Sequence, residues 1–359
     1  LPALPVPGDP EGLSERILEK FREPFHVGGQ EIHIHISIGI SRFPDDGKDG
    51  DTLVKHADVA LYHAKEKGKN SHEFFKPAMN NRAVERIAME NGLRRALKGG
   101  EFALYYQPEV DCEGRICGLE SLLRWNSPDQ GLVFPARIIH LAEKTGLMAP
   151  LGDWILREAC RQAEQWCRQG LTVPLVSVNL SATQFHNGKL VESIARILEE
   201  ERITPDFLEL EITESTAMRD INHSLTVMRK LKKMGVRLAL DDFGTGHSSL
   251  GYLKKFPIDT LKIDQLFIRE LLNNGQDRAI VLAILLLARS LNMRVVAEGV
   301  ESRDQFLWLQ KAGCDGLQGY LFGEAAPADR VTETLRMEAK ASLAPPPRPA
   351  ESKSAKLKT

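Results

Sequence analysis

The sequence has few cysteines, and they are not arranged as a zinc finger or a redox pair. Its five cysteines stand apart at positions 112, 117, 160, 167 and 314, with no CxxC pair and no histidine at zinc-finger spacing. A scattered, odd number of thiols in a chain of 359 residues is typical of packing residues in a reducing, cytosolic compartment. We therefore expect a cytosolic protein.

Long apolar runs and an excess of one charge are also missing. The most apolar stretch, residues 279–288, is far shorter than the ~20 residues that cross a bilayer. The N-terminus lacks the order of a signal peptide, in which an apolar run follows basic residues. The net charge of −2 excludes the basic excess expected of a protein that binds DNA or RNA duplexes. Because it has neither a membrane-spanning run nor a signal peptide, this chain should make no membrane contact of its own.

The chain begins at Leu1 without a methionine, and we expect it to be a piece excised from a larger protein. Absent N-terminal domains would then receive the input signal. They could also tether the full protein to a membrane.

Hydrophobic patterning separates a short first segment from a long repetitive region. In the first segment, residues 13–22 and 51–67 have helical spacing, and residues 32–41 alternate like a strand. This segment is too short to bury a good core by itself, so we expect residues 1–76 to be part of an α/β domain.

Three further regions complete the expected organisation. Residues 77–101 should form a connecting helix, with residues 102–335 as the main domain. Residues 336–359 contain a proline run, serines and lysines without an apolar pattern, and we expect them to be disordered.

Short apolar strands recur eight times in the main domain. They are expected at 102–107, 118–125, 175–181, 207–213, 237–243, 260–264, 294–300 and 316–321. Helical stretches separate most of them, which predicts parallel strands with helical crossovers and a TIM-like (β/α)8 barrel. Only a turn at 111–114 joins the first two strands, so this pair should be antiparallel.

Each expected strand carries a polar residue near its C-terminal end. These residues are Gln107, Glu120 with Arg124, Asn179, Glu211, Asp241 with Asp242, Lys262, Glu298 and Gln318. The active sites of such barrels lie on this rim. In Leu208-Glu209-Leu210-Glu211, alternation turns the leucines toward the helices and the glutamates toward the barrel axis.

Carboxylates crowded at this rim repel one another unless they are protonated or neutralised. A bound divalent cation resolves the conflict, and a ligand set of oxygen atoms suits Mg²⁺ or Mn²⁺ rather than Zn²⁺. Asp241 and Asp242 could serve two ions, and two-metal sites hydrolyse phosphodiesters. Lys262 could steady the attacking water or the charge on phosphorus. Alone, the Asp-Asp pair better fits a cap or a turn; with the other strand ends it favours a metal site.

Residues 242–250 (DFGTGHSSL) are rich in glycine but lack the Walker lysine and the GxGxxG spacing of phosphate loops. We interpret them as a mobile loop over the metal ions. His247 in this loop is a candidate general base, but a packing role is favoured.

Seven stretches in order resemble the EAL domain, a bacterial phosphodiesterase that linearises cyclic di-GMP to pGpG. They are YYQP (105–108), GLESLLRW (118–125), VNLS (178–181), LELEITES (208–215), LALDDFGTGHSSLGYLKKFPIDTLKID (238–264), VVAEGVE (295–301) and LQGYLF (317–322). The similar region covers residues 102–330, which include every rim residue given above.

The resemblance assigns a role to each matching residue. It implies metal ligands at Glu120, Asn179, Glu211, Asp241 and Asp242, with Asp241 bridging two ions. It implies that Lys262 contacts the catalytic water and that Glu298 either helps to hold the second ion or acts as the general base. Gln107, Arg124, Glu301 and Gln318 match substrate contacts, and Glu214 matches the glutamate that holds the Gly-rich loop.

This sequence departs from the family pattern at three places. Ser121 stands where the name-giving triplet has alanine, but it should point away from the metal ions and leave activity intact. His247 replaces a usual tyrosine, which could alter loop closure or dimer contacts. Residues 323–327 depart from the usual basic-Pro-Leu-Pro ending, and this puts one ligand contact in doubt.

Residues 11–76 resemble the C-terminal half of a GGDEF domain, through ISIGISRFP (36–44), ADVALYHAKEKGKN (57–70) and FF (74–75). The glycine-rich GGDEF hairpin itself is absent from the sequence. This chain should therefore not synthesise cyclic di-GMP.

The leading hypothesis is a metal-dependent cyclic-guanylate-specific phosphodiesterase that works as a homodimer. Its main rival is a catalytically silent cyclic di-GMP receptor, which some EAL domains become by losing metal ligands. The matching acids, asparagine and lysine are all present here, which favours the enzyme. A hydrolase for another phosphoester would leave Gln107, Arg124 and Gln318 unexplained.

Overall fold

The computed structural model describes residues 10–23, 25–27, 30–32, 36–66, 70–171, 175–244 and 250–343. The chain divides into two compact units, residues 1–92 and 93–359. Helix α3 (Pro77–Gly99) begins where the connecting helix was expected and contains the division between the units. No helix among the described residues is long and apolar enough to cross a membrane.

The first unit contains short strands and two amphipathic helices, α1 (Pro10–Lys20) and α2 (Gly50–Glu66). Its strands are β1 (Phe25–Val27), β2 (Gln30–Ile32), β3 (Ile38–Ile40) and β4 (His72–Phe74). Strands β1 and β2 form an antiparallel pair, and β3 pairs with β4 in parallel. A side chain at Gly39 would meet the backbone of α2, so this glycine lets the helix lie directly on β3.

The expected single strand over residues 32–41 is wrong in part. Strands β2 and β3 cover its two ends, but residues 36 and 37 between them are not in a strand. Residues 33–35 lie outside the described part of the chain. An alternating isoleucine pattern marks an extended backbone and does not reveal where pairing is interrupted.

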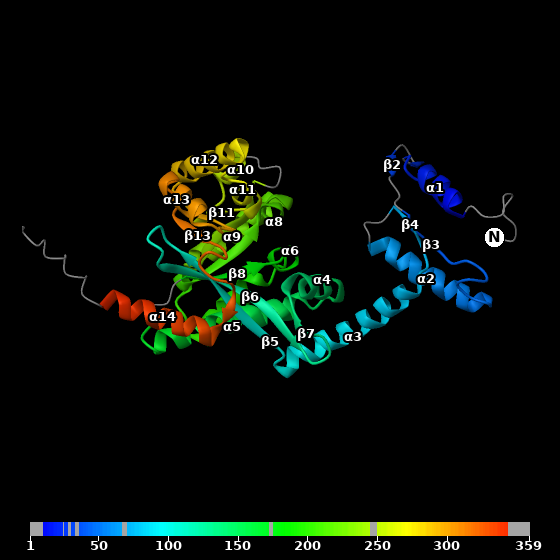
Figure 1. Ribbon diagram of the computed structural model, residues 1–359, viewed down its shortest axis with the longest axis horizontal. Coiled ribbons are helices and arrows are strands. Elements are labelled where there is room, and N and C mark those ends of the chain that lie inside the picture. The colour runs from blue at the N-terminus through cyan, green and yellow to red at the C-terminus, as the bar shows by residue number, and fades with distance from the viewer. Residues whose placement is uncertain are drawn as a thin grey trace, which may run out of the picture. The chain divides into compact units, whose positions relative to one another are not determined.

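The second unit is a closed barrel, as the sequence predicted (Figure 1). Its strands among the described residues are β5 (Phe102–Val110), β6 (Ile116–Ser127), β8 (Leu175–Leu180), β9 (Leu208–Thr213), β10 (Arg237–Phe243), β11 (Thr260–Ile263), β12 (Arg294–Ala297) and β13 (Gly316–Gln318). Hydrogen bonding runs through them in the order β5-β13-β12-β11-β10-β9-β8-β6 and back to β5. The antiparallel β5–β6 pair is confirmed. Strand β5 is also antiparallel to β13, so it runs against the other seven.

Two short strands extend the sheet beyond the ring. Strand β7 (Gly131–Val133) pairs with the end of β6, and β14 (Ala326–Pro327) pairs with β5. Strand β7 pairs with the C-terminal end of β6, and β14 pairs with Tyr105 and Tyr106 next to Gln107, so both strands extend the wall at the mouth of the barrel.

Helices cover the outside of the barrel (Figure 1). The longer ones are α4 (Pro135–Thr145), α5 (Met148–Arg168), α7 (Leu190–Glu201), α9 (Ile221–Lys233), α12 (Gly275–Ser290), α13 (Arg303–Ala312) and α14 (Ala328–Leu343). Short turns of helix follow several strands: α6 (Ala182–Phe185), α8 (Glu214–Arg219), α10 (Leu250–Leu253), α11 (Gln265–Arg269) and the 3-10 turn η1 (Pro205–Phe207). The apolar stripes of these helices bury the outward-facing residues of the strands.

One packing centre joins the start and the end of the barrel unit. The Trp166 ring on α5 packs edge-on against Tyr106 of β5, with ring centroids 5.0 Å apart. Its indole N–H donates a 2.7 Å hydrogen bond to the hydroxyl of Thr332 on α14. Both aromatic side chains are at most 1% exposed. Helix α14 continues to Leu343, so residues 336–343, which were expected to be disordered, are helical, whereas residues 344–359 lie outside the described residues.

A glycine-to-alanine change tests how closely the segment after β13 approaches the segment after β12. A Cβ on Gly319, just after β13, would lie 2.2 Å from the carbonyl oxygen of Val300 and 2.3 Å from its nitrogen. Because both atoms belong to backbone, the chain must shift, and we expect Gly319→Ala to cost about 2 kcal/mol or more of unfolding free energy. Gly188→Ala is the control, since nothing lies within 4 Å of its added Cβ. Urea unfolding measures both, and equal stability of the two variants would contradict the close approach.

Candidate active site

Lys262 lies at the centre of the barrel mouth, surrounded by carboxylates. Its Nζ lies 2.8 Å from Oε1 of Glu211, 2.7 Å from Oε1 of Glu298 and 3.7 Å from Oε2 of Glu120. The lysine side chain is 1% exposed. Burial lowers the pKa of Lys262, but the surrounding carboxylates raise it more, so its pKa lies well above the usual value. The amine is therefore a permanent positive charge inside the barrel.

Glu120 joins three strands through its two carboxylate oxygens. Its Oε1 accepts a 2.6 Å hydrogen bond from Nδ2 of Asn179 on β8, and its Oε2 accepts one of 2.6 Å from Nε2 of Gln318 on β13. Gln318 also donates a 3.4 Å hydrogen bond to Oε1 of Gln107 on β5, directly across from Glu120. Four residues predicted from separate strands thus form one connected network.

Asp241 and Asp242 end β10 in a bent backbone. Asp242 has a left-handed φ of 55°, and its N–H donates a 2.8 Å hydrogen bond to Oδ1 of Asp241. This geometry folds the two carboxyl groups onto the same rim. Burial, the neighbouring Asp241 and Asp264 raise the pKa of Asp242 to about 6. Burial and Glu120 likewise raise the pKa of Asp241 against the opposing charge of Lys262.

Buried and half-buried acids surround the lysine in greater number than one ammonium group can neutralise. Desolvation raises the pKa of Glu211 well above its usual value, and it raises that of Glu298 to about 8. Oε2 of Glu211 is buried and has no hydrogen-bond partner among the described residues. The mouth of the barrel therefore has capacity for additional positive charge.

Arg124 and the β14 strand form one side of the mouth. The Arg124 guanidinium lies over the rings of Tyr105 and Phe134, at 5.3 and 5.2 Å from their centroids. Gln107 donates a 3.2 Å hydrogen bond to the carbonyl of Gly323. The unusual segment 323–327 therefore still closes on the site, through this bond and through the pairing of β14 with β5.

The remaining predicted residues differ in how the structure places them. Glu214 is 2% exposed and accepts a 3.2 Å hydrogen bond from the N–H of Gly244, where the Gly-rich loop begins. Residues 245–249, with His247, lie outside the described residues. The side chain of Ser121 donates to the carbonyl of Ser177, 2.7 Å away, and does not join the acidic network. Glu301 is exposed; its backbone N–H donates to Gln305, and no contact joins its side chain to the described acidic network.

A second polar layer lies within the barrel beneath the site, and sequence reasoning missed most of it. Glu209 is fully buried and accepts a 2.7 Å hydrogen bond from Thr260 across β10. Arg294 lies 3.7 Å from the carboxylate of Glu109, which is also fully buried, and its NH2 lies 2.8 Å from the sulfur of Cys117. The alternation of strand residues was the signal that could have revealed this layer. Glu109 stands two residues after Gln107, and Glu209 stands two residues before Glu211, so each faces the same side of its strand as a predicted site residue. Burial raises the pKa of Glu209 to about 7.

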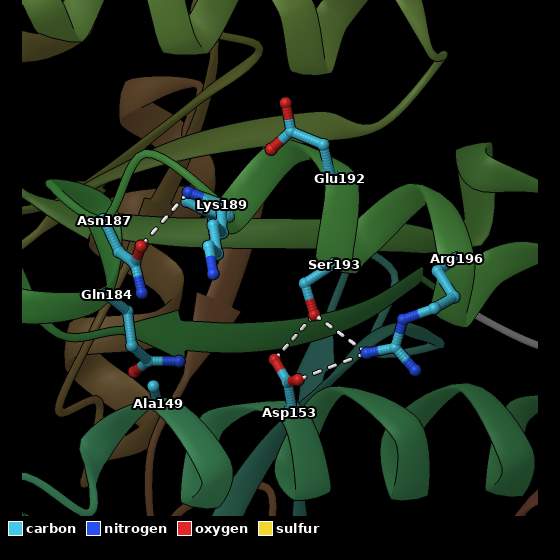
Figure 2. Close-up of a pocket in the computed structure, with 9 residues that line it drawn as sticks. Ala149, Asp153, Gln184, Asn187, Lys189, Glu192, Ser193 and Arg196 are labelled. Atoms are coloured by element: carbon cyan, nitrogen blue, oxygen red, sulfur yellow. Dashed lines mark hydrogen bonds and ion pairs between the residues drawn. The ribbon is translucent and has the colours of Figure 1, made fainter.

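A surface hollow of about 510 Å³ lies outside the barrel, between α5, α6 and α7 (Figure 2). Figure 2 shows Asp153 accepting a hydrogen bond from Ser193 and contacting Arg196, which ties α5 to α7. Gln184 at its edge forms a capping box with Ser181, two residues beyond Asn179. The hollow therefore belongs to the support of β8 rather than to the acidic site.

The family of the chain follows from comparison with known proteins. The EAL domain family matches residues 90–325, and the GGDEF domain of diguanylate cyclases matches residues 9–71. The chain belongs to the EAL domain family. The solved structure of the PaMucR phosphodiesterase in complex with c-di-GMP is 46% identical, with a TM-score of 0.66, and the match covers 68% of this chain and 99% of that one.

Two longer proteins of Pseudomonas aeruginosa are also similar to this EAL protein. The bifunctional diguanylate cyclase/cyclic di-GMP phosphodiesterase MucR is 44% identical over 330 residues, covering 92% of this chain and 48% of that protein. The cyclic di-GMP phosphodiesterase NbdA is 38% identical over 325 residues, covering 90% and 42%. The EAL chain thus spans less than half of the length of either relative.

The residues of this EAL site fit a hard divalent cation. The donor set of Glu120, Asn179, Glu211, Asp241 and Asp242 consists of oxygen-bearing side chains, as Mg²⁺ and Mn²⁺ prefer. The unpartnered Oε2 of Glu211 adds a buried anionic donor. In the described part of the chain, no three acidic, histidine or cysteine side chains already surround a common cation position, and Glu211 and Glu298 form ion pairs with Lys262.

Replacing the buried lysine tests its role in neutralising the EAL site. We expect Lys262→Met to lower the unfolding free energy by about 3–5 kcal/mol in EDTA, since it leaves buried carboxylates without their counter-ion. Lys232→Met removes the partly exposed partner of Asp259 and should cost at most about 1 kcal/mol. Urea denaturation of both variants measures the difference. Equal losses would show that Lys262 does not hold the carboxylates together.

Proposed function

We propose that this EAL domain hydrolyses cyclic di-GMP to linear pGpG with a water activated by two divalent metal ions, Mg²⁺ or Mn²⁺. The observation that carries the proposal is the convergence of Glu120, Glu211 and Lys262 at one barrel mouth with Asn179 and Asp241. Relatives named as cyclic di-GMP phosphodiesterases support the substrate. When bound, the metal ions would lower the pKa of the attacking water and stabilise the leaving oxygen.

The chain's own residues would divide the remaining work. Glu120, Asn179, Glu211, Asp241 and Asp242 hold the ions. Lys262, with a pKa well above its usual value, stays charged and donates hydrogen bonds to the water or to the phosphoryl oxygens. Burial raises the pKa of Glu298 to about 8, close to the neutral pH at which a general base is most effective, and Glu298 would act as that base or help to hold the second ion.

The substrate contacts would lie around the network of Gln107 and Gln318, with Arg124 and Glu301 as further contacts. Arg124 forms no ion pair with described residues, so its guanidinium is available for a phosphate. Glu214 would hold the start of the Gly-rich loop near the ions. The five free cysteines agree with our placement of this chemistry in the cytosol.

The rival function is a silent receptor for cyclic di-GMP. A receptor needs the substrate contacts and not the metal ligands. Here Glu120 and Glu211 are buried beside Lys262 although their carboxylates repel each other, a costly arrangement that binding alone does not require. This observation favours the enzyme.

Product analysis tests the function directly. The whole chain is incubated with cyclic di-GMP and Mg²⁺ or Mn²⁺, and the products are separated by chromatography. We expect pGpG from the wild type, at least a ~100-fold slower reaction from Glu120→Ala, and none in EDTA, because both changes remove metal binding. Lys189→Ala, at the surface hollow, is the control and should keep full activity. Bound but intact cyclic di-GMP would support the receptor instead.

We also propose that the domain forms a homodimer through the outer face of α12. Its inner face is buried by residues such as Val281 and Ile284, while Leu282 and Leu286 are 42% and 63% exposed. The inner face also adjoins Gly244, because a Cβ there would lie 3.7 Å from Cδ1 of Ile284. A second copy covering the leucines would therefore lie on the helix whose inner face packs against Gly244, the last described residue before the Gly-rich loop.

Molar mass in solution tests the dimer. We expect Leu286→Glu to halve the mass measured by light scattering, since a buried charge opposes an apolar interface. Leu307→Glu changes an exposed leucine on α13 and should leave the mass unchanged. A monomeric wild type would contradict the proposal.

A further inference from the structure

An exposed phenylalanine is fixed at the mouth of the barrel. Strand β7 pairs with the end of β6, with Val133 opposite Trp125, and so delivers the next residue, Phe134, beside Arg124. Phe134 is the N-cap residue of α4, and Pro135 begins that helix. A strand on one side and a proline-started helix on the other leave the backbone at Phe134 little freedom.

The guanidinium of Arg124 lies over one face of the Phe134 ring. It lies between Tyr105 and Phe134, and its NH1 donates a 2.9 Å hydrogen bond to the carbonyl of Leu123. The arginine is only 8% exposed, and desolvation lowers its pKa. Contacts between a cation and two rings orient both the charge and the ring planes.

The rest of the Phe134 ring is exposed to solvent. Phe134 is 60% exposed, although large aromatic side chains usually bury most of their surface. Tyr320, two residues after Gln318, is 67% exposed and close enough to Arg124 to contribute to the pKa of the guanidinium. Exposed rings therefore lie around a cationic group within the mouth of the acidic site.

We propose that Phe134 is a stacking platform for one purine base of the substrate, while the adjacent Arg124 binds the phosphate linked to that nucleoside. This proposal rests on the proposed function, since cyclic di-GMP would supply the base. Aromatic rings stack on nucleobases, and an arginine beside the ring adds affinity for the neighbouring phosphate. Phe134 would then be a specificity residue that selects purine-bearing diesters over small phosphodiesters.

Two substitutions separate stacking from simple packing. Phe134→Leu keeps an apolar side chain and removes the ring, whereas Phe134→Tyr restores the ring. We expect Phe134→Leu to raise KM for cyclic di-GMP by at least about 5-fold with kcat unchanged, as loss of one stacked base predicts. Phe134→Tyr should return KM to the wild-type value. Leu132→Ala, an exposed residue of the same short strand, is the control and should not change KM.

Fluorescence reports on the stack itself. A cyclic dinucleotide that carries 2-aminopurine in place of one guanine loses fluorescence when that base stacks on an aromatic ring. In EDTA, where turnover is blocked, binding to the wild type and to Phe134→Tyr should quench the probe, and bound Phe134→Leu should quench it less. Circular dichroism verifies that the variants fold.

The possible outcomes distinguish this inference from the proposed function. If the wild type is active and Phe134→Leu has the same KM and the same fluorescence quenching, the stacking role of Phe134 is overturned. The proposed phosphodiesterase function would be unaffected by that result. A fall in kcat without a change in KM would also overturn the stacking role and would show that Phe134 acts by positioning Arg124. A wild type that neither binds nor hydrolyses cyclic di-GMP would overturn both proposals.

Discussion

The carboxylates that face the interior of the barrel repel one another, and the buried ammonium group of Lys262 offsets much of that repulsion. Lys262 contacts Glu211 and Glu298 directly and lies 3.7 Å from Glu120. One positive charge does not neutralise this set; burial raises the pKa of Glu211 and of Glu298, and the neighbouring carboxylates raise both further. The proposed divalent cations would neutralise the same excess of negative charge, so the cost of burying these carboxylates and the proposed chemistry have one origin.

Strand β5 makes this arrangement possible by running against the other strands. It brings Gln107 opposite Glu120 at the mouth and carries Glu109 deeper, toward Arg294. The barrel interior therefore holds two polar layers, each with its own cation: the buried Lys262 at the mouth and the partly exposed Arg294 below it. The lower layer orients Glu209 and Thr260 on β9 and β11, the strands that carry Glu211 and Lys262 two residues further along. Substitutions in the lower layer should thus affect the site through these two strands.

The strand positions and the rim residues could be predicted from the sequence because both depend on local alternation. In LELEIT of β9, a period of two residues is enough to turn both glutamates inward. The closure of the barrel and the antiparallel β5–β6 pair followed from strand number and turn length. Assigning metal ions and cyclic di-GMP needed the family resemblance as well.

Other features depend on register between distant segments, and the sequence does not encode them locally. The Glu109–Arg294 pair joins β5 and β12, which are far apart in the sequence but have only β13 between them in the sheet. The position of Phe134 beside Arg124 depends on the three-residue strand β7, which is too short to show a pattern. The disordered tail was expected to begin at residue 336, but α14 continues to Leu343; Val331 and Leu335 mark its buried face, whereas polar residues alternate with apolar ones over residues 336–343 and give no helical stripe.

The most direct measurement is the anomalous scattering of manganese in crystals of the whole chain grown with Mn²⁺. If the acidic mouth is a divalent metal site, strong peaks will lie between Glu120, Asn179, Glu211 and Asp241, with carboxylates withdrawn from Lys262 to coordinate the ions. Absence of manganese from this position, with Glu211 and Glu298 still paired to Lys262, would contradict the account.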